Sequence, residues 1–117
     1  MYYSLIITFI EQPLFTRLLT DLIDDEHYRK FQQELARNPE KGVLVPGTGG
    51  LRKVRMALPG RGKSGGARVL YLYFSGHQTI IFYYLYTKGD FENIPASQLK
   101  GIRYEVQRIK KTFGARN

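Results

Sequence analysis

The chain has 117 residues, of which 43% are hydrophobic and 14% aromatic, and this size and composition predict one compact domain over residues 1–117. It contains no cysteine and only two histidines, which excludes disulfides and thiolate zinc sites and disfavours a histidine-based metal cage or catalytic triad. The start of the chain lacks the features of a signal peptide, and no apolar run approaches the ~20 residues of a membrane span. We therefore expect a cytoplasmic protein that does not bind membranes.

The net charge of +8 is confined to the middle of the sequence. Between Lys41 and Gly89 there is no Asp or Glu but there are eight Lys and Arg residues, whereas the charges on either side of this segment cancel. Clustered cations repel one another, and folding them together is favourable mainly when a polyanion neutralises them. The pattern favours a nucleic-acid partner, with a basic solubilising face as the alternative.

The first third of the chain predicts a strand followed by two helices. The β-branched and aromatic run 3–10 is typical of a strand. Pro13 suits the first turn of a helix that runs to about Leu22, and Asp24 is a good N-cap for a second helix. That second helix ends before Pro39, because the residue preceding a proline disfavours the helical conformation. We expect the two helices to form a hairpin.

A basic strand is predicted after the glycine-rich connector 46–50. Apolar and polar residues alternate over 51–58, so apolar side chains point to one face of the strand while Lys53 and Arg55 point to the other. The segment 59–66 is predicted to be a loop that joins this strand to the next one.

The remainder predicts a strand hairpin and a final helix. Strands are expected over 67–74 and 79–87, joined by a turn at 75–78. The last helix follows Ile94-Pro95-Ala96-Ser97 and places on one face the apolar residues Leu99, Ile102, Val106, Ile109 and Phe113. The expected fold is α+β, in the order β-α-α-β-β-β-α, with a small, mostly antiparallel four-stranded sheet, an N-terminal helical hairpin and a C-terminal helix.

The segment Gly60–Gly66 contains a Gly-Lys-Ser sequence but is not a nucleotide-binding P-loop. A P-loop requires a preceding strand, its full spacing and a following helix whose N-terminus faces the phosphates, whereas here Pro59 precedes the first glycine and a strand follows. What remains is a cationic loop whose glycines allow its backbone to approach a sugar-phosphate chain.

Three cations are candidates for binding a phosphate group. Lys53 and Arg55 share one strand face, and Arg68 opens the next strand, so the three converge if the strands pair antiparallel. A solvated outer face is the alternative. Tyr86, at the end of the last strand, is the tyrosine that we expect to stack on a base. The two histidines lack partners for imidazole acid–base catalysis, and no metal site is expected.

The sequence resembles a known family in three segments. They are Gly47-Thr48-Gly49-Gly50-Leu51-Arg52-Lys53-Val54-Arg55, then Gly60-x-Gly62-Lys63-x-Gly65-Gly66-x-Arg68-Val69-Leu70-Tyr71, and Leu85-Tyr86-x-Lys88. This pattern resembles the HigB-like branch of the RelE/ParE superfamily, the toxins of type II toxin–antitoxin modules. The resemblance covers most of the chain.

The resemblance implies a RelE-like domain, with a small sheet and helices on one side, that enters the ribosomal A site and cuts translated mRNA. Cleavage uses the RNA's own 2′-hydroxyl, so no metal or other cofactor is implied. The catalytic candidates are Lys53, Arg55, Lys63, Arg68 and Tyr86, with RNA-binding candidates Arg52, Arg61 and Lys88. The implied partners are the ribosome with its mRNA and a cognate antitoxin, often with a helix-turn-helix domain, through which the complex binds promoter DNA.

Two other functions fit the same sequence. Some relatives carry a catalytic tyrosine after the last core strand, or use a Glu or His near the basic strand. Here the segment 88–94 contains neither tyrosine nor histidine, and Tyr86 is the substitute candidate. The same fold also serves toxins that inhibit DNA gyrase without cutting anything. A passive basic RNA-binding module is a third interpretation, since fold does not determine function.

Overall fold

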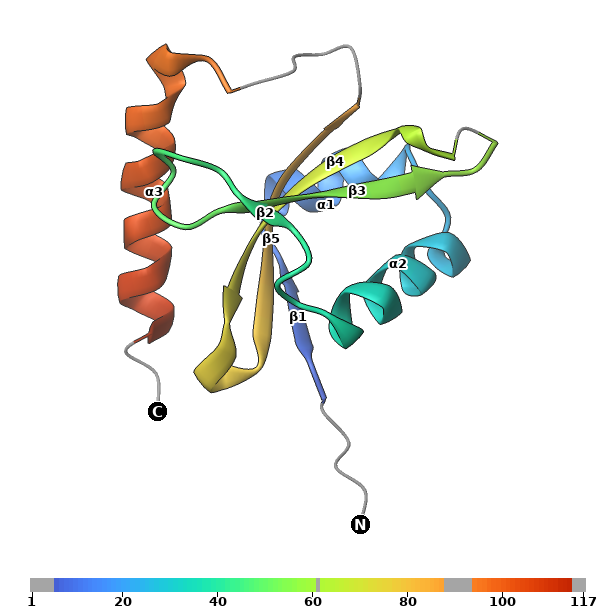
Figure 1. The fold of residues 1–117 in the computed structure, drawn as a ribbon, viewed down its shortest axis with the longest axis horizontal. Helices are drawn as coiled ribbons and strands as arrows, with labels where there is room; N and C mark the ends of the chain where they lie inside the picture. The colour runs from blue at the N-terminus through green and yellow to red at the C-terminus, as the bar shows by residue number, and fades with distance from the viewer. Residues whose placement is uncertain (1–5, 61, 88–93, 115–117) are drawn as a thin grey trace.

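The computed structural model describes residues 6–60, 62–87 and 94–114, with residues 62–64 described by their backbone alone. Its elements, in chain order, are β1 (Thr8–Glu11), α1 (Pro13–Thr20), α2 (Asp25–Arg37), β2 (Val43–Leu44), β3 (Arg52–Leu58), β4 (Gly62–Phe74), the 3₁₀ turn η1 (Ser75–His77), β5 (Thr79–Thr87) and α3 (Ala96–Gly114). The described strands form one sheet in the order β1-β5-β4-β3-β2 (Figure 1). β1 pairs with β5 in parallel, and all the other pairs are antiparallel.

The two N-terminal helices begin where the sequence predicts. Pro13 occupies the first turn of α1, where its missing N–H has no helical partner to lose. The Asp24 side chain accepts a hydrogen bond of 2.9 Å from the His27 N–H and thereby caps α2. The first strand is shorter than predicted: it begins at Thr8, residues 6–7 lie before it, and the predicted residues 3–5 lie outside the described residues.

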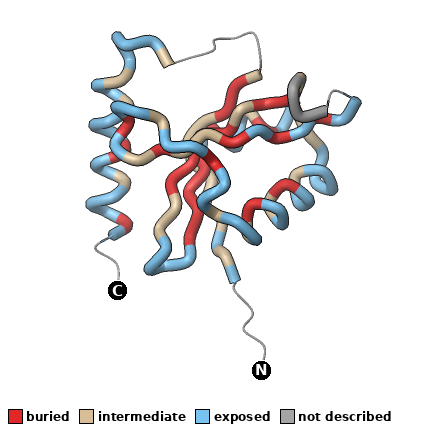
Figure 2. The backbone as a smooth tube through the Cα atoms, viewed as in Figure 1, coloured by how far each residue is buried: buried red, intermediate tan, exposed pale blue. Residues whose placement is uncertain are grey.

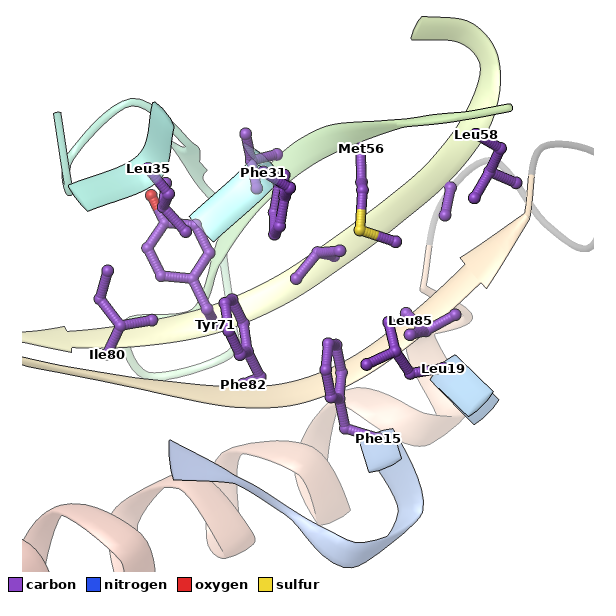
Figure 3. Packing of buried hydrophobic residues seen from close by; sticks show 13 residues of the cluster. Phe15, Leu19, Phe31, Leu35, Met56, Leu58, Tyr71, Ile80, Phe82 and Leu85 are labelled. Atoms are coloured by element: carbon purple, nitrogen blue, oxygen red, sulfur yellow. The ribbon is translucent and has the colours of Figure 1, made fainter. Parts of the chain in front are cut away.

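Helices cover both faces of the sheet, so the expectation of helices on one side is wrong. α1 and α2 pack on one face, where the rings of Phe15 and Phe82 stack with centroids 4.9 Å apart (Figure 3). α3 packs on the other face and buries Val106 and Phe113. The physical reason lies in the central strands. Most of β5 is buried (Figure 2), and its side chains belong to core clusters on both faces of the sheet, so the strand requires cover on each side.

The sheet contains one more strand than the four predicted. The fifth strand, β2, consists of two residues that pair with β3. Two residues are too few to show the alternation of apolar and polar side chains by which a strand is predicted. The predicted loop 59–66 is also shorter than expected, because β4 already begins at Gly62, opposite Leu58. Pairing with β3 thus extends a glycine-rich segment into the ladder in spite of its low strand propensity.

A tight turn over residues 46–50 fastens α3 to the sheet. The buried Thr48 donates to the Val45 carbonyl at 2.7 Å and accepts from the Leu51 N–H at 3.1 Å. The turn's carbonyls then accept hydrogen bonds from two α3 side chains, Arg103 and Lys110. None of the described helices, α3 included, is long and apolar enough to cross a membrane.

Candidate functional site

A row of three side chains crosses the sheet over β3, β4 and β5. Arg55 lies opposite Arg68 in the β3–β4 register, and Arg68 lies opposite Tyr86 in the β4–β5 register. Paired residues point to the same face of a sheet, and alternation places this row on the face of Leu70, which packs in the α3 cluster. We call Arg55, Arg68 and Tyr86 the arginine row. It joins cations from two predicted strands, as the sequence led us to expect.

A second row runs beside the first on the same face. It consists of Lys53, Leu70 and Tyr84, which are paired in the same two registers. Successive residues on one face of a strand are roughly 7 Å apart, so the two rows are close enough to contact one nucleotide together. The rings of Tyr84 and Tyr86 lie 6.3 Å apart between centroids and connect the rows at the β5 side.

The arginine row is built to attract an anion. Arg55 is exposed and Arg68 is half-buried, with one guanidinium N–H donating to the Gly66 carbonyl at 3.2 Å. Among the described residues, no carboxylate lies within ion-pair distance of Arg55 or Lys53. Like charges directly opposite on paired strands repel, and a bound phosphate converts that repulsion into two charge-assisted interactions.

Tyr86 contributes a hydroxyl group rather than an open ring. The residue is only 5% exposed, which leaves little ring surface on which a base could stack in this conformation. Burial raises the pKa of Tyr86 above 10.0, and the nearby positive charge of Arg68 partly opposes this effect. The phenol therefore remains protonated at neutral pH and is able to donate a hydrogen bond.

The sequence was compared with models of known families. Residues 16–114 match the family described as the RelE toxin of the RelE / RelB toxin-antitoxin system, a range that includes both rows and all of α3. The chain belongs to the RelE toxin family. As a RelE-family toxin, it has an antitoxin as its implied partner.

Arg52 of this RelE-family toxin does not join the site. Alternation along β3 turns it away from Lys53 and Arg55, and its guanidinium donates to the carbonyls of Glu40 at 3.1 Å and Gly42 at 2.8 Å. The side chain thus fastens the segment between α2 and β2. These two carbonyls lie ten or more residues away, so the local sequence pattern could not indicate this structural contact. The assignment of Arg52 to RNA binding remains a prediction.

Three of the predicted cations cannot be placed. Arg61 and Lys88 lie outside the described residues. The backbone of Lys63 forms part of β4, but its side chain is not among those described. Their assignment to catalysis or RNA binding therefore remains a prediction.

Tyr84 lies in the second row of the RelE-family toxin, although it was not among the residues that the sequence singled out. It is half-buried and lies on the face of the arginine row. The signal was present in the sequence, since Tyr84 and Tyr86 are two residues apart on one strand and must share a face. Assigning that face required the β4–β5 register, which shifts between Leu70 and Tyr71.

Both histidines lie apart from the rows. His27 contacts Asp24 at the start of α2, with 2.6 Å between the imidazole Nδ1 and the carboxylate Oδ1. The ring of His77 packs edge-on against Phe113, with centroids 5.0 Å apart. Among the described residues, no three His, Cys, Asp or Glu side chains are grouped so as to hold a metal ion.

Proposed function

We propose that this toxin is a HigB-like, ribosome-dependent mRNA endoribonuclease that cuts translated mRNA in the ribosomal A site and so inhibits translation in the cytoplasm. The observation that carries the proposal is the direct opposition of Arg55 and Arg68 on one face of the sheet, with Tyr86 completing the row. Two planar guanidinium forks on directly paired residues are suited to binding a tetrahedral or pentavalent phosphate.

The proposed reaction is attack by the RNA's own 2′-oxygen on the adjacent phosphorus. The new bond joins that oxygen to phosphorus while the bond to the 5′ oxygen of the next nucleotide breaks, leaving a 2′,3′-cyclic phosphate and a 5′-hydroxyl. The phosphorane in between carries an additional negative charge on its oxygens. Arg55 and Arg68 stabilise that charge, and the Tyr86 hydroxyl donates a hydrogen bond to the same group.

Two protons move in this reaction. One leaves the 2′-hydroxyl, and one reaches the departing 5′ oxygen. We assign these transfers to Lys53, on the basic strand β3, and Lys63, whose backbone lies at the start of β4. Lys53 shares the face of the arginine row and is two residues from Arg55.

The proposal includes the partners of the toxin. The substrate is mRNA held in the ribosomal A site, and the antitoxin carries a helix-turn-helix domain through which the pair binds its own promoter. The family match supports the antitoxin as a class of partner. The basic segment and the arginine row support RNA as the substrate.

The deciding experiment is primer extension on a translated reporter mRNA after brief induction of the toxin. New 5′ ends within codons, absent when the reporter's start codon is removed, are the expected result. DNA breaks that accumulate while translation continues would instead establish inhibition of gyrase. RNA binding without new ends in any mRNA would leave only a passive RNA-binding module.

A further inference from the structure

A cavity of about 430 Å³ opens beside the two rows, between the start of α1, the middle of β5 and the first half of α3. Its apolar walls include Leu70 and Ile102, and the ring of Tyr84 lines it as well. Its polar side chains include Gln12, Gln98 and Glu105. Nothing described so far, in the arginine row or in the proposed reaction, uses this cavity.

The position of the cavity relates it to the arginine row. Leu70 and Tyr84 belong both to the cavity wall and to the second row, which runs beside Arg55 and Arg68 on the same face of the sheet. Rows that neighbour each other along a strand are roughly 7 Å apart, comparable with the distance from a nucleotide's phosphate to its own base. A phosphate held by the arginine row therefore places an adjoining base at the cavity mouth.

The chemistry of the walls suits a flat, polar-edged ring. A base unstacked from its neighbours is bound by aromatic and apolar surfaces on its faces and by hydrogen bonds along its edge. Leu70, Ile102 and Tyr84 offer the surfaces, and the two glutamine amides offer both donors and acceptors.

Glu105 is the acidic side chain on the described cavity wall. The Tyr83 hydroxyl donates to its Oε1 at 2.7 Å and fixes the carboxylate, while Oε2 has no partner among the described residues. A carboxylate accepts hydrogen bonds and cannot donate them. It therefore favours the base whose Watson–Crick edge presents a ring N–H beside an amino group, which is guanine.

We propose that this cavity is a guanine-selective base subsite for the nucleotide adjoining the phosphate at the arginine row, with Glu105 as the specificity-determining residue. The subsite rests on the proposed function for its biological setting, because it reads a base of the RNA that the toxin is proposed to cut. Base binding itself needs no ribosome and is measured separately.

The first experiment titrates the full-length toxin with guanosine 5′-monophosphate and, separately, with adenosine 5′-monophosphate, followed by NMR. The expected result is chemical-shift change at Leu70, Ile102 and Glu105, with guanosine monophosphate binding about tenfold more tightly, the difference expected for one hydrogen bond to a charged group. Glu105→Gln should remove most of this difference, because it replaces a pure acceptor with an amide. Glu26→Gln, at an exposed carboxylate in the first turn of α2, is the matched control and should retain it.

The second experiment sequences the cut sites in a translated mRNA library. Wild-type toxin should favour guanosine at one codon position, and Glu105→Gln should reduce that preference while Glu26→Gln retains it. Nucleotide binding by the isolated toxin without mRNA cleavage would overturn the nuclease but not the subsite. Cleavage without base preference, together with no shift from guanosine monophosphate, would overturn the subsite alone. The subsite would also be overturned if an antitoxin peptide, and not guanosine monophosphate, changed the chemical shifts of these residues.

Discussion

Arg55 of β3 and Arg68 of β4 are direct partners in an antiparallel ladder, so two cationic side chains rise from neighbouring strands on one face of the sheet. An opposite-charge pair at such a position stabilises a sheet, whereas like charges directly opposite one another repel. An anion that binds between the two guanidinium groups would therefore gain charge-assisted hydrogen bonds from both strands.

Arg55→Ala should abolish toxicity without lowering the stability of the fold. Loss of one donor to the phosphorane is expected to raise the activation barrier by more than about 2 kcal/mol, or slow cleavage roughly thirtyfold. The free energy of unfolding should stay the same or rise, because a repulsive cation is removed from an exposed position. Single-turnover cleavage on programmed ribosomes and urea denaturation measure the two effects.

The controls for this variant separate charge from geometry. Arg55→Lys keeps the charge but loses the planar fork, and we expect it to remain strongly impaired. Arg29→Ala removes an exposed cation from α2 and should leave toxicity unchanged. Undiminished toxicity of Arg55→Ala at matched expression would disprove the role of the arginine row.

A single 2′-deoxy substitution at the cleaved nucleotide should block cutting while leaving toxin binding to programmed ribosomes almost unchanged. The proposed nucleophile is the 2′-hydroxyl, and the row contacts the phosphate, which the substitution does not alter. Cleavage of the deoxy and all-ribose codons is compared on gels, with binding followed by filtration. Efficient cutting of the deoxy codon would show that the nucleophile lies elsewhere.

Two glycines should respond to alanine in opposite directions. A Cβ at Gly42 would lie 2.8 Å from Cε1 of Tyr71 and 3.0 Å from the Lys53 carbonyl oxygen, both held in place, so Gly42→Ala should destabilise the fold by about 1–3 kcal/mol. A Cβ at Gly101, in the exposed interior of α3, meets nothing within 4 Å, and Gly101→Ala should add about 0.5–1 kcal/mol. Urea denaturation of both variants tests the pair, and equal shifts of one sign would contradict the packing described for Tyr71.

The free energy of unfolding should fall as the pH rises above 10. Burial raises the pKa of Tyr28 above its ordinary value of 10.0, and the hydrogen-bonded Glu11 carboxylate raises it further. Burial also raises the pKa of Tyr83, and the Glu105 carboxylate adds to that effect. The unfolded chain therefore releases these phenol protons first, so their stabilising contribution is complete below pH 10 and is lost progressively above it.

Tyr28→Phe tests the alkaline effect, because it removes one of these ionisations. Its free energy of unfolding should decline less than that of the wild type between pH 8 and pH 11, as measured by urea denaturation. Tyr104→Phe, at a residue that is 64% exposed, is the control and should decline as steeply as the wild type. Identical slopes for all three proteins would contradict the assignment.

The sequence predicts much of this fold because its local signals agree with one another. Proline and aspartate mark the starts of α1 and α2, and alternation correctly separates Lys53 and Arg55 from the buried side of β3. Only short segments connect β3 to β4 and β4 to β5, and short connections favour antiparallel pairing of the strands. The class α+β and the convergence of Arg55 and Arg68 were thus accessible from patterns alone.

The remaining features depend on contacts between distant residues. Helical periodicity identifies the apolar stripe of α3 but not which face of the sheet it covers. The role of Arg52 depends on two backbone carbonyls between α2 and β2, and the place of Tyr84 depends on a register shift within the β4–β5 pair. The cavity beside Glu105 forms only when α1, β5 and α3 come together.

The parallel pairing of β1 with β5 has a practical consequence for attaching labels. β1 begins at Thr8, opposite Thr79, and near the end of α3 Phe113 packs against His77. The start of β1 and the end of α3 therefore both lie near the β4–β5 hairpin (Figure 1). Tyr86 lies seven residues further along β5, roughly 23 Å away at 3.3 Å per residue. A fluorophore or surface tether attached at the start of β1 or at the end of α3 would lie far along β5 from the arginine row. It would leave the row accessible to a ribosome in solution.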